Sequence, residues 1–140
     1  GPGQLVAYPI INLLAAAPTI DYPGYVRTLE VVLIDTLADH AISAHTLEGF
    51  SGAWIIRGEP EKIAAVGVRV DGRGITTHGI ALNVAPDLRF FGYIVHCGIA
   101  DKGVTSMERV AETTPTMADV KWTIARHFAA VFGFRPTNGG

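Results

Sequence analysis

The sequence predicts an α+β fold, with helices packed against one antiparallel or mixed sheet. Two helical patterns flank a series of short strand-like runs, and turn residues separate these runs from one another. The order of strand, long helix, hairpin-connected strands and second helix is typical of this class. A chain of 140 residues is about the size of one domain and is long enough to bury a core. We therefore expect residues 1–140 to form a single domain.

The first two predicted elements are a strand and a helix. Residues 4–13 have the apolar character of a buried strand. From residue 25 to about residue 41 the apolar side chains recur at steps of three to five, which predicts an amphipathic helix. Asp21 and Pro23 precede or open this pattern and act as start signals for the helix.

Three strand-like runs follow, each separated from the next by turn residues. They cover residues 52–56, 62–70 and 75–84. The sequence "RGEP" divides the first two and "DGRG" the last two, and both are typical of hairpin turns. Successive hairpins place neighbouring strands antiparallel to one another, so these runs predict the central part of the sheet.

A second helix is predicted to begin at "TMAD", where Thr116 and Asp119 have the spacing of a capping box. Gly133 is a stop signal for this helix. Its predicted apolar face consists of Met117, Val120, Ile124, Phe128 and Val131.

Charge and composition exclude several classes of function. Eleven basic and thirteen acidic residues give a formal net charge of -2, without a basic block, so we expect no nucleic-acid partner. No apolar run reaches the roughly 20 residues that span a bilayer, and we expect no membrane association. A single cysteine forms no internal disulfide, which favours the cytoplasm. Neither CxxC nor HExxH is present, so we expect no metal site.

Cys97, in "YIVHCGIADKGVTS", is the single cysteine and has two interpretations. Free cysteine is among the most buried residue types, so packing is the more common role. A nucleophilic cysteine needs a nearby cation, a helix N-terminus or a base that favours the thiolate. Gly98 and Gly103 flank the cysteine, as expected where the backbone approaches a ligand closely. Composition alone favours packing and leaves catalysis open.

Lys62 begins a strand and is either a solvated strand end or an ammonium directed into a pocket. Ala64, Ala65 and Gly67 follow it, and their small side chains leave room for a ligand. A desolvated lysine loses its proton more readily than an exposed one. His78 marks either a strand bulge at a site or, more commonly, a core imidazole.

Taken together, the motifs resemble those of the lipoyl(octanoyl) transferase family, in the same order and over nearly the whole chain. They are "GPGQLVAYPIINL", "YVRTLE", "SGAWI", "KIAAVGVRV", "HGIALNV", "CGIADKGVTS" and "MADV". The resemblance implies the α+β fold shared with biotin–protein and lipoate–protein ligases. It implies transfer of an octanoyl group from octanoyl-acyl carrier protein to a lysine of lipoyl domains, the first step of endogenous protein lipoylation. The acceptors would be 2-oxoacid dehydrogenases and the glycine cleavage H protein, and no cofactor would be required.

The resemblance also assigns roles to individual residues. Cys97 corresponds to the acyl-carrying nucleophile, and Lys62 to the lysine that lowers the thiol pKa and relays protons. The implied substrate-lining residues form two triplets: Ala65, Val66 and Gly67, and Gly79, Ile80 and Ala81.

The chain departs from the family pattern in two places. His96 stands where family members usually have proline, which adds an ionisable neighbour to Cys97. Family members also carry a segment resembling R-G-G-x-x-T-x-H ahead of "GPGQ". The resemblance therefore implies a catalytic domain that lacks the family's N-terminal segment.

Two alternatives remain open. A ligase of the same fold would activate lipoate or biotin with ATP and would need no nucleophilic cysteine, so "CGI" disfavours it. A non-catalytic fragment would bind only an acyl chain or a lipoyl domain.

Overall fold

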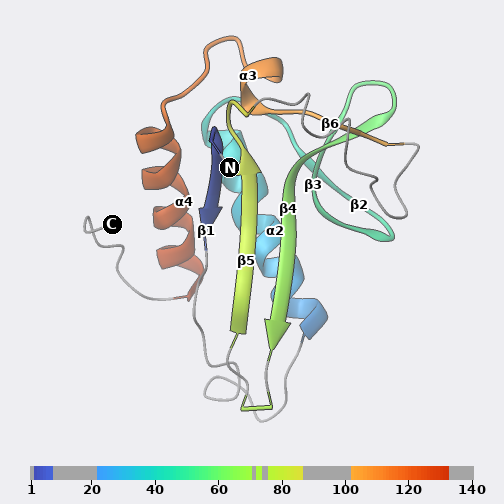
Figure 1. Ribbon diagram of the computed structural model, residues 1–140, viewed down its shortest axis with the longest axis vertical. Helices are drawn as coiled ribbons and strands as arrows, with labels where there is room; N and C mark the ends of the chain where they lie inside the picture. The colour runs from blue at the N-terminus through green and yellow to red at the C-terminus, as the bar shows by residue number, and fades with distance from the viewer. Residues whose placement is uncertain (1, 8–21, 71, 74–75, 87–101, 133–140) are drawn as a thin grey trace.

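The computed structural model describes residues 2–7, 22–70, 72–73, 76–86 and 102–132 (Figure 1). The strands in this part of the chain are β1 (Gln4–Ala7), β2 (His45–Leu47), β3 (Phe50–Ile56), β4 (Pro60–Val70), β5 (Thr76–Asn83) and β6 (Gly103–Val104). The helices are α2 (Tyr22–Asp39), α3 (Met107–Val110) and α4 (Met117–Phe132).

The strands form one mixed sheet in the order β1-β5-β4-β3-β2. All neighbours along this path are antiparallel, whereas β6 adds to β4 in parallel. The two long central strands, β4 and β5, lie side by side and are joined by the hairpin predicted at "DGRG" (Figure 1). The predicted α+β class, with a sheet covered by helices, is confirmed.

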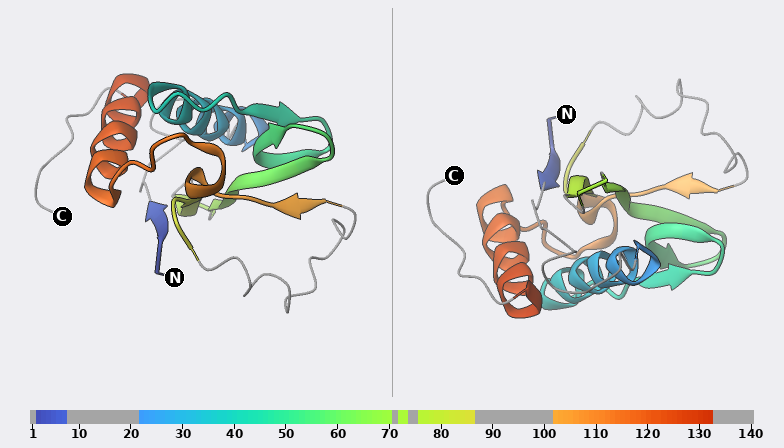
Figure 2. Two further views of the ribbon diagram at one scale, coloured as in Figure 1. Left: turned by 90° about the horizontal axis from the view of Figure 1, so that it is seen from above. Right: turned by 90° about the horizontal axis from the view of Figure 1, so that it is seen from below.

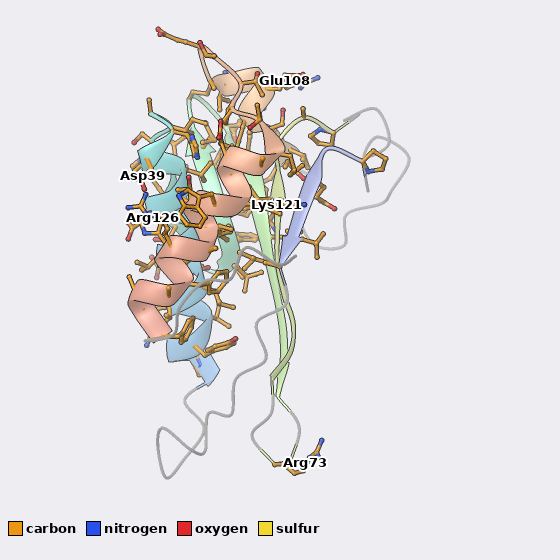
Figure 3. The ribbon with its side chains drawn as sticks, turned by 90° about the vertical axis from the view of Figure 1, so that its left-hand side faces the viewer. Asp39, Arg73, Glu108, Lys121 and Arg126 are labelled. Atoms are coloured by element: carbon orange, nitrogen blue, oxygen red, sulfur yellow. The ribbon has the colours of Figure 1, made fainter. Side chains whose placement is uncertain are left out.

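The helices cover one side of the sheet. Helix α2 packs against β3, β4 and β5, and α4 packs against α2. Viewed from above and from the side, both helices lie on the same side of the strands (Figures 2 and 3). Leu29, Leu33 and Leu37 repeat every four residues along α2 and are fully buried. Their burial follows from the predicted apolar stripe, because residues four apart share one helix face.

Helix α2 ends two residues before the predicted boundary. The N–H of Ile42 donates to the carbonyl oxygen of Leu37, and that of Ala41 to the carbonyl oxygen of Ala38. These two bonds form a Schellman motif, in which the penultimate residue is left-handed. Ala41 adopts this conformation with φ of 61°, although glycine is the residue that adopts it at least cost. The sequence lacks the usual glycine signal, and the predicted end was therefore late.

Helix α4 begins as its sequence predicts. The hydroxyl oxygen of Thr116 accepts a hydrogen bond from the N–H of Asp119, at 3.1 Å. Val120, Ile124 and Phe128 are buried, but Val131 is 44% exposed, so the predicted apolar face was wrong at its last position. Gly133 lies outside the described residues.

Three short elements, β2, β6 and α3, were not predicted, because each has too few residues to show a period. The strand predicted over 4–13 is described only as far as Ala7. None of the helices in the described residues combines the length and the apolar character that crossing a bilayer requires.

Candidate functional site

The two predicted substrate-lining triplets are direct neighbours in the sheet. The antiparallel register of β4 and β5 pairs Ala65 with Ala81, Val66 with Ile80, and Gly67 with Gly79. Each residue of one triplet therefore lies opposite a residue of the other, although the turn between them separates the triplets in the sequence. The structure brings all six predicted residues together.

Alternation along the strands divides these six residues between two faces. Val66 and Ile80 pack into the hydrophobic core under the helices. The four small residues lie on the opposite face, which is turned away from α2; they are Ala65, Gly67, Gly79 and Ala81. A Cβ atom added at Gly67 would meet no atom within 4 Å. The second face is therefore a wall of small residues with open space at Gly67, whereas Val66 and Ile80 present only backbone to it.

Lys62 reaches the same face as this wall because β4 contains a bulge. Ala53 pairs with Ala64, but the next residue of β3, Trp54, pairs with Lys62, so Ile63 is an extra residue in β4. Ile63 and Ala64 are both fully buried in the core. Without the extra residue, Lys62 would share the core face with Ala64. Ala64, expected to leave room for a ligand, packs in the core instead.

The ammonium of Lys62 is partly removed from water and lies against an aromatic ring. Its Nζ atom is 5.1 Å from the ring centroid of Trp54, a side chain with 0% exposure. Among the residues that the structure describes, no carboxylate forms an ion pair with this ammonium. Burial lowers the pKa of Lys62 below its ordinary value of 10.5. The geometry favours the desolvated interpretation of Lys62 over the solvated one.

Gly52 makes room for the Lys62 side chain. Its φ of +105° is in the left-handed region, and an added Cβ would collide with the carbonyl oxygen of Ala64. The same Cβ would lie 3.5 Å from Cε of Lys62, so the lysine stem passes directly over Gly52. The N–H of Gly52 donates to Oε2 of Glu30, at 2.8 Å. Glu30 is a carboxylate of α2 with 6% exposure.

Asn83 joins three of the sequence motifs next to this wall. Its Nδ2 atom donates to the carbonyl oxygen of Thr105 at 3.1 Å, and its Oδ1 accepts from Nε2 of Gln4 at 2.9 Å. The N–H of Thr105 in turn donates to the carbonyl oxygen of Lys62, at 2.9 Å. One side-chain amide thus ties "GPGQ", "HGIALNV" and "GVTS" together beside Lys62.

Strand β6 returns the chain to the sheet beside Lys62. In the parallel register, Gly103 pairs with Glu61 and Val104 with Lys62. Just before this strand, the Nζ atom of Lys102 lies 4.8 Å from the ring centroid of Phe50. The Phe50 ring meets the Trp54 ring edge-to-face at 6.0 Å. The aromatic pair on β3 therefore contacts two ammonium groups.

Cys97 and His96 lie outside the described residues, so their contact with Lys62 stays a prediction. The backbone of His78 pairs with Val68, and its side chain is likewise outside the description. In the described part of the chain, no three His, Cys, Asp or Glu side chains are grouped to hold a metal ion.

Sequence reasoning missed Glu30, Gly52, Trp54, Asn83 and Gln4. Each stands within a quoted motif, which is the signal that would have pointed to it. Their contacts join segments far apart in the chain, and residue spacing does not reveal such contacts.

Comparison with known proteins gives two kinds of match. Residues 1–129 match the family described as lipoyl protein ligase A/B catalytic domain. An octanoyltransferase of Chloroflexus aggregans is 45% identical over 137 residues, which are 98% of this chain and 61% of the relative. An octanoyltransferase of Koribacter versatilis is 45% identical over 132 residues, 94% of this chain and 52% of the relative. The chain thus spans between half and two thirds of these curated relatives.

Solved structures share the fold at low sequence identity. A bipartite lipoate protein ligase from Thermoplasma acidophilum superimposes with a TM-score of 0.76 at 16% identity, over 97% of this chain and 55% of the other. The biotin protein ligase of Aquifex aeolicus gives a TM-score of 0.65 at 12% identity, over 94% and 53% of the two chains. These likenesses confirm the expected resemblance to the biotin and lipoate ligase fold.

Proposed function

Because the chain belongs to the family of lipoyl protein ligase A/B catalytic domains, we propose that it is the catalytic domain of an octanoyltransferase. The donor is octanoyl-acyl carrier protein, and the acceptors are lysines of lipoyl domains in 2-oxoacid dehydrogenases and the glycine cleavage H protein. Relatives 45% identical to this chain are named octanoyltransferases, whereas the ligase structures share only its fold. The reaction needs a free thiol, which favours the reducing cytoplasm.

One observation carries the proposal: a partly buried ammonium lies on the same face as a wall of small side chains. The wall supports a slot for a linear acyl chain, because alanine and glycine leave space beside the backbone. Burial of each methylene contributes about 0.8 kcal/mol, so a slot of fixed length discriminates between chains. Burial lowers the pKa of Lys62, so this ammonium gives up its proton more readily than an exposed lysine does.

In the proposed first step, the thiolate of Cys97 attacks the thioester carbonyl of octanoyl-acyl carrier protein. The bond to the phosphopantetheine sulfur breaks, and the ammonium of Lys62 gives its proton to that sulfur. Exchange of one thioester for another is close to isoenergetic, so the step requires no ATP. The octanoyl group is then held as a thioester of Cys97.

In the second step, the amine of the incoming lysine attacks the acyl-cysteine. Lys62, now neutral, accepts a proton from that amine, and the thiolate of Cys97 leaves. The product is an amide, and conversion of a thioester to an amide drives the reaction forward. Both residues return to their starting protonation states.

The anchoring of β6 supports this pairing of Cys97 with Lys62. Gly103 pairs with Glu61, the neighbour of Lys62, and it follows Cys97 by six residues. Six residues reach at most roughly 20 Å when fully extended. The covalent connection alone therefore keeps the cysteine within that distance of Gly103.

The experiment is to incubate the protein with octanoyl-acyl carrier protein and measure its intact mass. We expect one added octanoyl group that is absent from Cys97→Ser, and transfer of this group to a lipoyl domain without ATP. Lipoate attachment that depends on ATP would instead identify a ligase. Binding of the acyl chain or lipoyl domain without an adduct would identify a non-catalytic protein, and either result would contradict the proposal.

The role of Lys62 is tested separately by the reactivity of Cys97 with iodoacetamide as a function of pH. Lys62→Ala removes the cation that favours the thiolate, so the thiol pKa should rise and the rate profile should move to higher pH. An unchanged profile would contradict the ion-pair role.

A further inference from the structure

Trp54 is the aromatic residue against which the Lys62 ammonium lies, and nothing in the reaction itself requires an indole. We propose that Trp54 is a positioning residue for Lys62, whose ring holds the ammonium over the small-residue wall and shields it from water. The inference rests on the proposed function insofar as Lys62 transfers the protons. It does not rest on Cys97.

The Trp54 ring is held in place by contacts that do not involve Lys62. Its Nε1 atom donates to the carbonyl oxygen of Ser51, at 3.2 Å. The centroids of the Trp54 and Phe50 rings are 6.0 Å apart, and the interplanar angle is 69°. Aromatic pairs favour this edge-to-face geometry. Because the side chain is fully buried, the ring has little freedom to rotate. It therefore offers the lysine a fixed surface.

The stem of Lys62 is guided towards this ring by the backbone beneath it. The stem passes over Gly52, and a Cβ atom added at Gly52 would lie 3.5 Å from Cε of Lys62. The hydrogen bond from Gly52 N–H to Glu30 fixes that part of β3 against α2. The bulge at Ile63 turns the side chain to this face. Backbone and indole together define the path of the lysine.

A neutral partner suits a lysine that must give up its proton. A free lysine side chain has many rotamers, so an ammonium without a fixed contact would sample many positions. A carboxylate would hold it but would favour the charged form and raise its pKa. An aromatic face attracts an ammonium more weakly than a carboxylate does, so it holds the side chain while raising the pKa less.

The nearby charged side chains are engaged elsewhere. Glu61 accepts from Arg57 at 3.1 Å, Glu30 accepts from Gly52, and Lys102 lies over Phe50. Within the described part of the chain, none of them forms an ion pair with Lys62. Among the described residues, the indole is thus the contact given for this ammonium.

The kinetic test is a double-mutant cycle in the full-length protein. Trp54→Leu should lower kcat about 10-fold and leave KM for octanoyl-acyl carrier protein within about 2-fold, because the ring acts on Lys62 rather than on the donor. Trp54→Phe should restore most of the lost rate. In a Lys62→Ala background, Trp54→Leu should cause no further loss. Trp122→Leu, which changes the other tryptophan, 52% exposed on α4, is the control.

An equal loss of kcat in the presence and absence of Lys62 would overturn the proposal, since a purely structural role predicts it. So would equal rates for Trp54→Leu and the wild type. The Phe variant keeps an aromatic ring at this position, and it therefore tests the proposal even where Trp54→Leu fails to fold.

A spectroscopic test needs no enzyme turnover. In Trp122→Phe, Trp54 is the sole tryptophan, and its emission should titrate with the Lys62 ammonium below pH 10.5. The titration should disappear in Lys62→Met; its presence there, or its absence from the parent, would overturn the contact. A protein that shows this titration but transfers no octanoyl group would contradict the proposed function and leave the positioning role intact.

Discussion

The carboxylate of Glu30 on α2 accepts a hydrogen bond from the backbone N–H of Gly52 on β3, at 2.8 Å. This bond crosses from the helical layer to the sheet at the point where the Lys62 stem passes over Gly52. It satisfies a buried N–H group that would otherwise lack a partner, and it fixes the backbone beneath the site. The two residues belong to separate sequence motifs, "YVRTLE" and "SGAWI".

Glu30→Ala should lower the free energy of unfolding by about 2 kcal/mol or more, because it leaves the N–H of Gly52 buried without an acceptor. Glu30→Gln keeps an acceptor oxygen and should recover part of that loss. Glu108→Ala, at an exposed position of α3 (Figure 3), is the control and should change little. Urea denaturation measures all three; equal stabilities of Glu30→Ala and Glu108→Ala would show that the bond is unimportant.

Lys62→Met should stabilise the folded protein at neutral pH, with the gain shrinking as the pH rises. The folded-state pKa of Lys62 is lowered, so the unfolded chain binds more protons between that pKa and 10.5. Wild-type stability therefore rises with pH across this window, as the buried ammonium loses its charge. Urea denaturation of both proteins from pH 7 upward measures the difference. A difference independent of pH would mean that Lys62 is not desolvated.

Gly67→Val should shorten the acyl chain that the protein accepts, without unfolding it. The position is open and its φ is not left-handed, so a side chain fits and projects from the small-residue wall. Valine would remove the room for about two methylenes, and burial of each methylene contributes about 0.8 kcal/mol. The preference for octanoyl over hexanoyl should therefore fall about 10-fold. Competition between the two thioesters measures this ratio. Gly72→Ala, at the exposed hairpin turn next to Arg73 (Figure 3), should leave it unchanged.

Ala41→Gly should stabilise the protein by about 1 kcal/mol. Ala41 is left-handed at the end of α2, where a Cβ atom is strained and glycine is not. Ala38→Gly, three residues earlier and still helical, should destabilise by about 0.5–1 kcal/mol. Thermal unfolding of the two variants should therefore move in opposite directions, and a shared direction would contradict the assignment of the cap.

Thr105→Val should be neutral or stabilising by up to about 1 kcal/mol. The Oγ1 atom of Thr105 is buried and has no hydrogen-bond partner among the residues that the structure describes, so removing it relieves a desolvation cost. Thr123→Val is the matched control. The Thr123 hydroxyl donates to the carbonyl oxygen of Asp119 and contacts Nε2 of His40, so its loss should destabilise. A clear loss of stability in Thr105→Val would indicate a partner for that hydroxyl.

Local sequence was sufficient for the long elements. Apolar residues at steps of three to five predicted α2, Thr116 and Asp119 predicted the start of α4, and the turn residues predicted the meander β3-β4-β5. These features depend on neighbours in the chain. The end of α2 was predicted late because Ala41 carries the left-handed conformation that glycine usually signals.

Local sequence patterns were enough to predict the fold class and to point to the small residues of the wall and to Lys62. They also gave Cys97 its proposed role, which stays a prediction. The face of the sheet on which each of these side chains lies depends on how the strands pair. In a regular strand, side chains alternate between faces, so Lys62 would lie on the core face with Ala64. Because Ile63 is an extra residue, the Lys62 side chain instead lies on the opposite face, beside Trp54. A bulge arises from the pairing of two strands, and no single strand's sequence reveals that pairing.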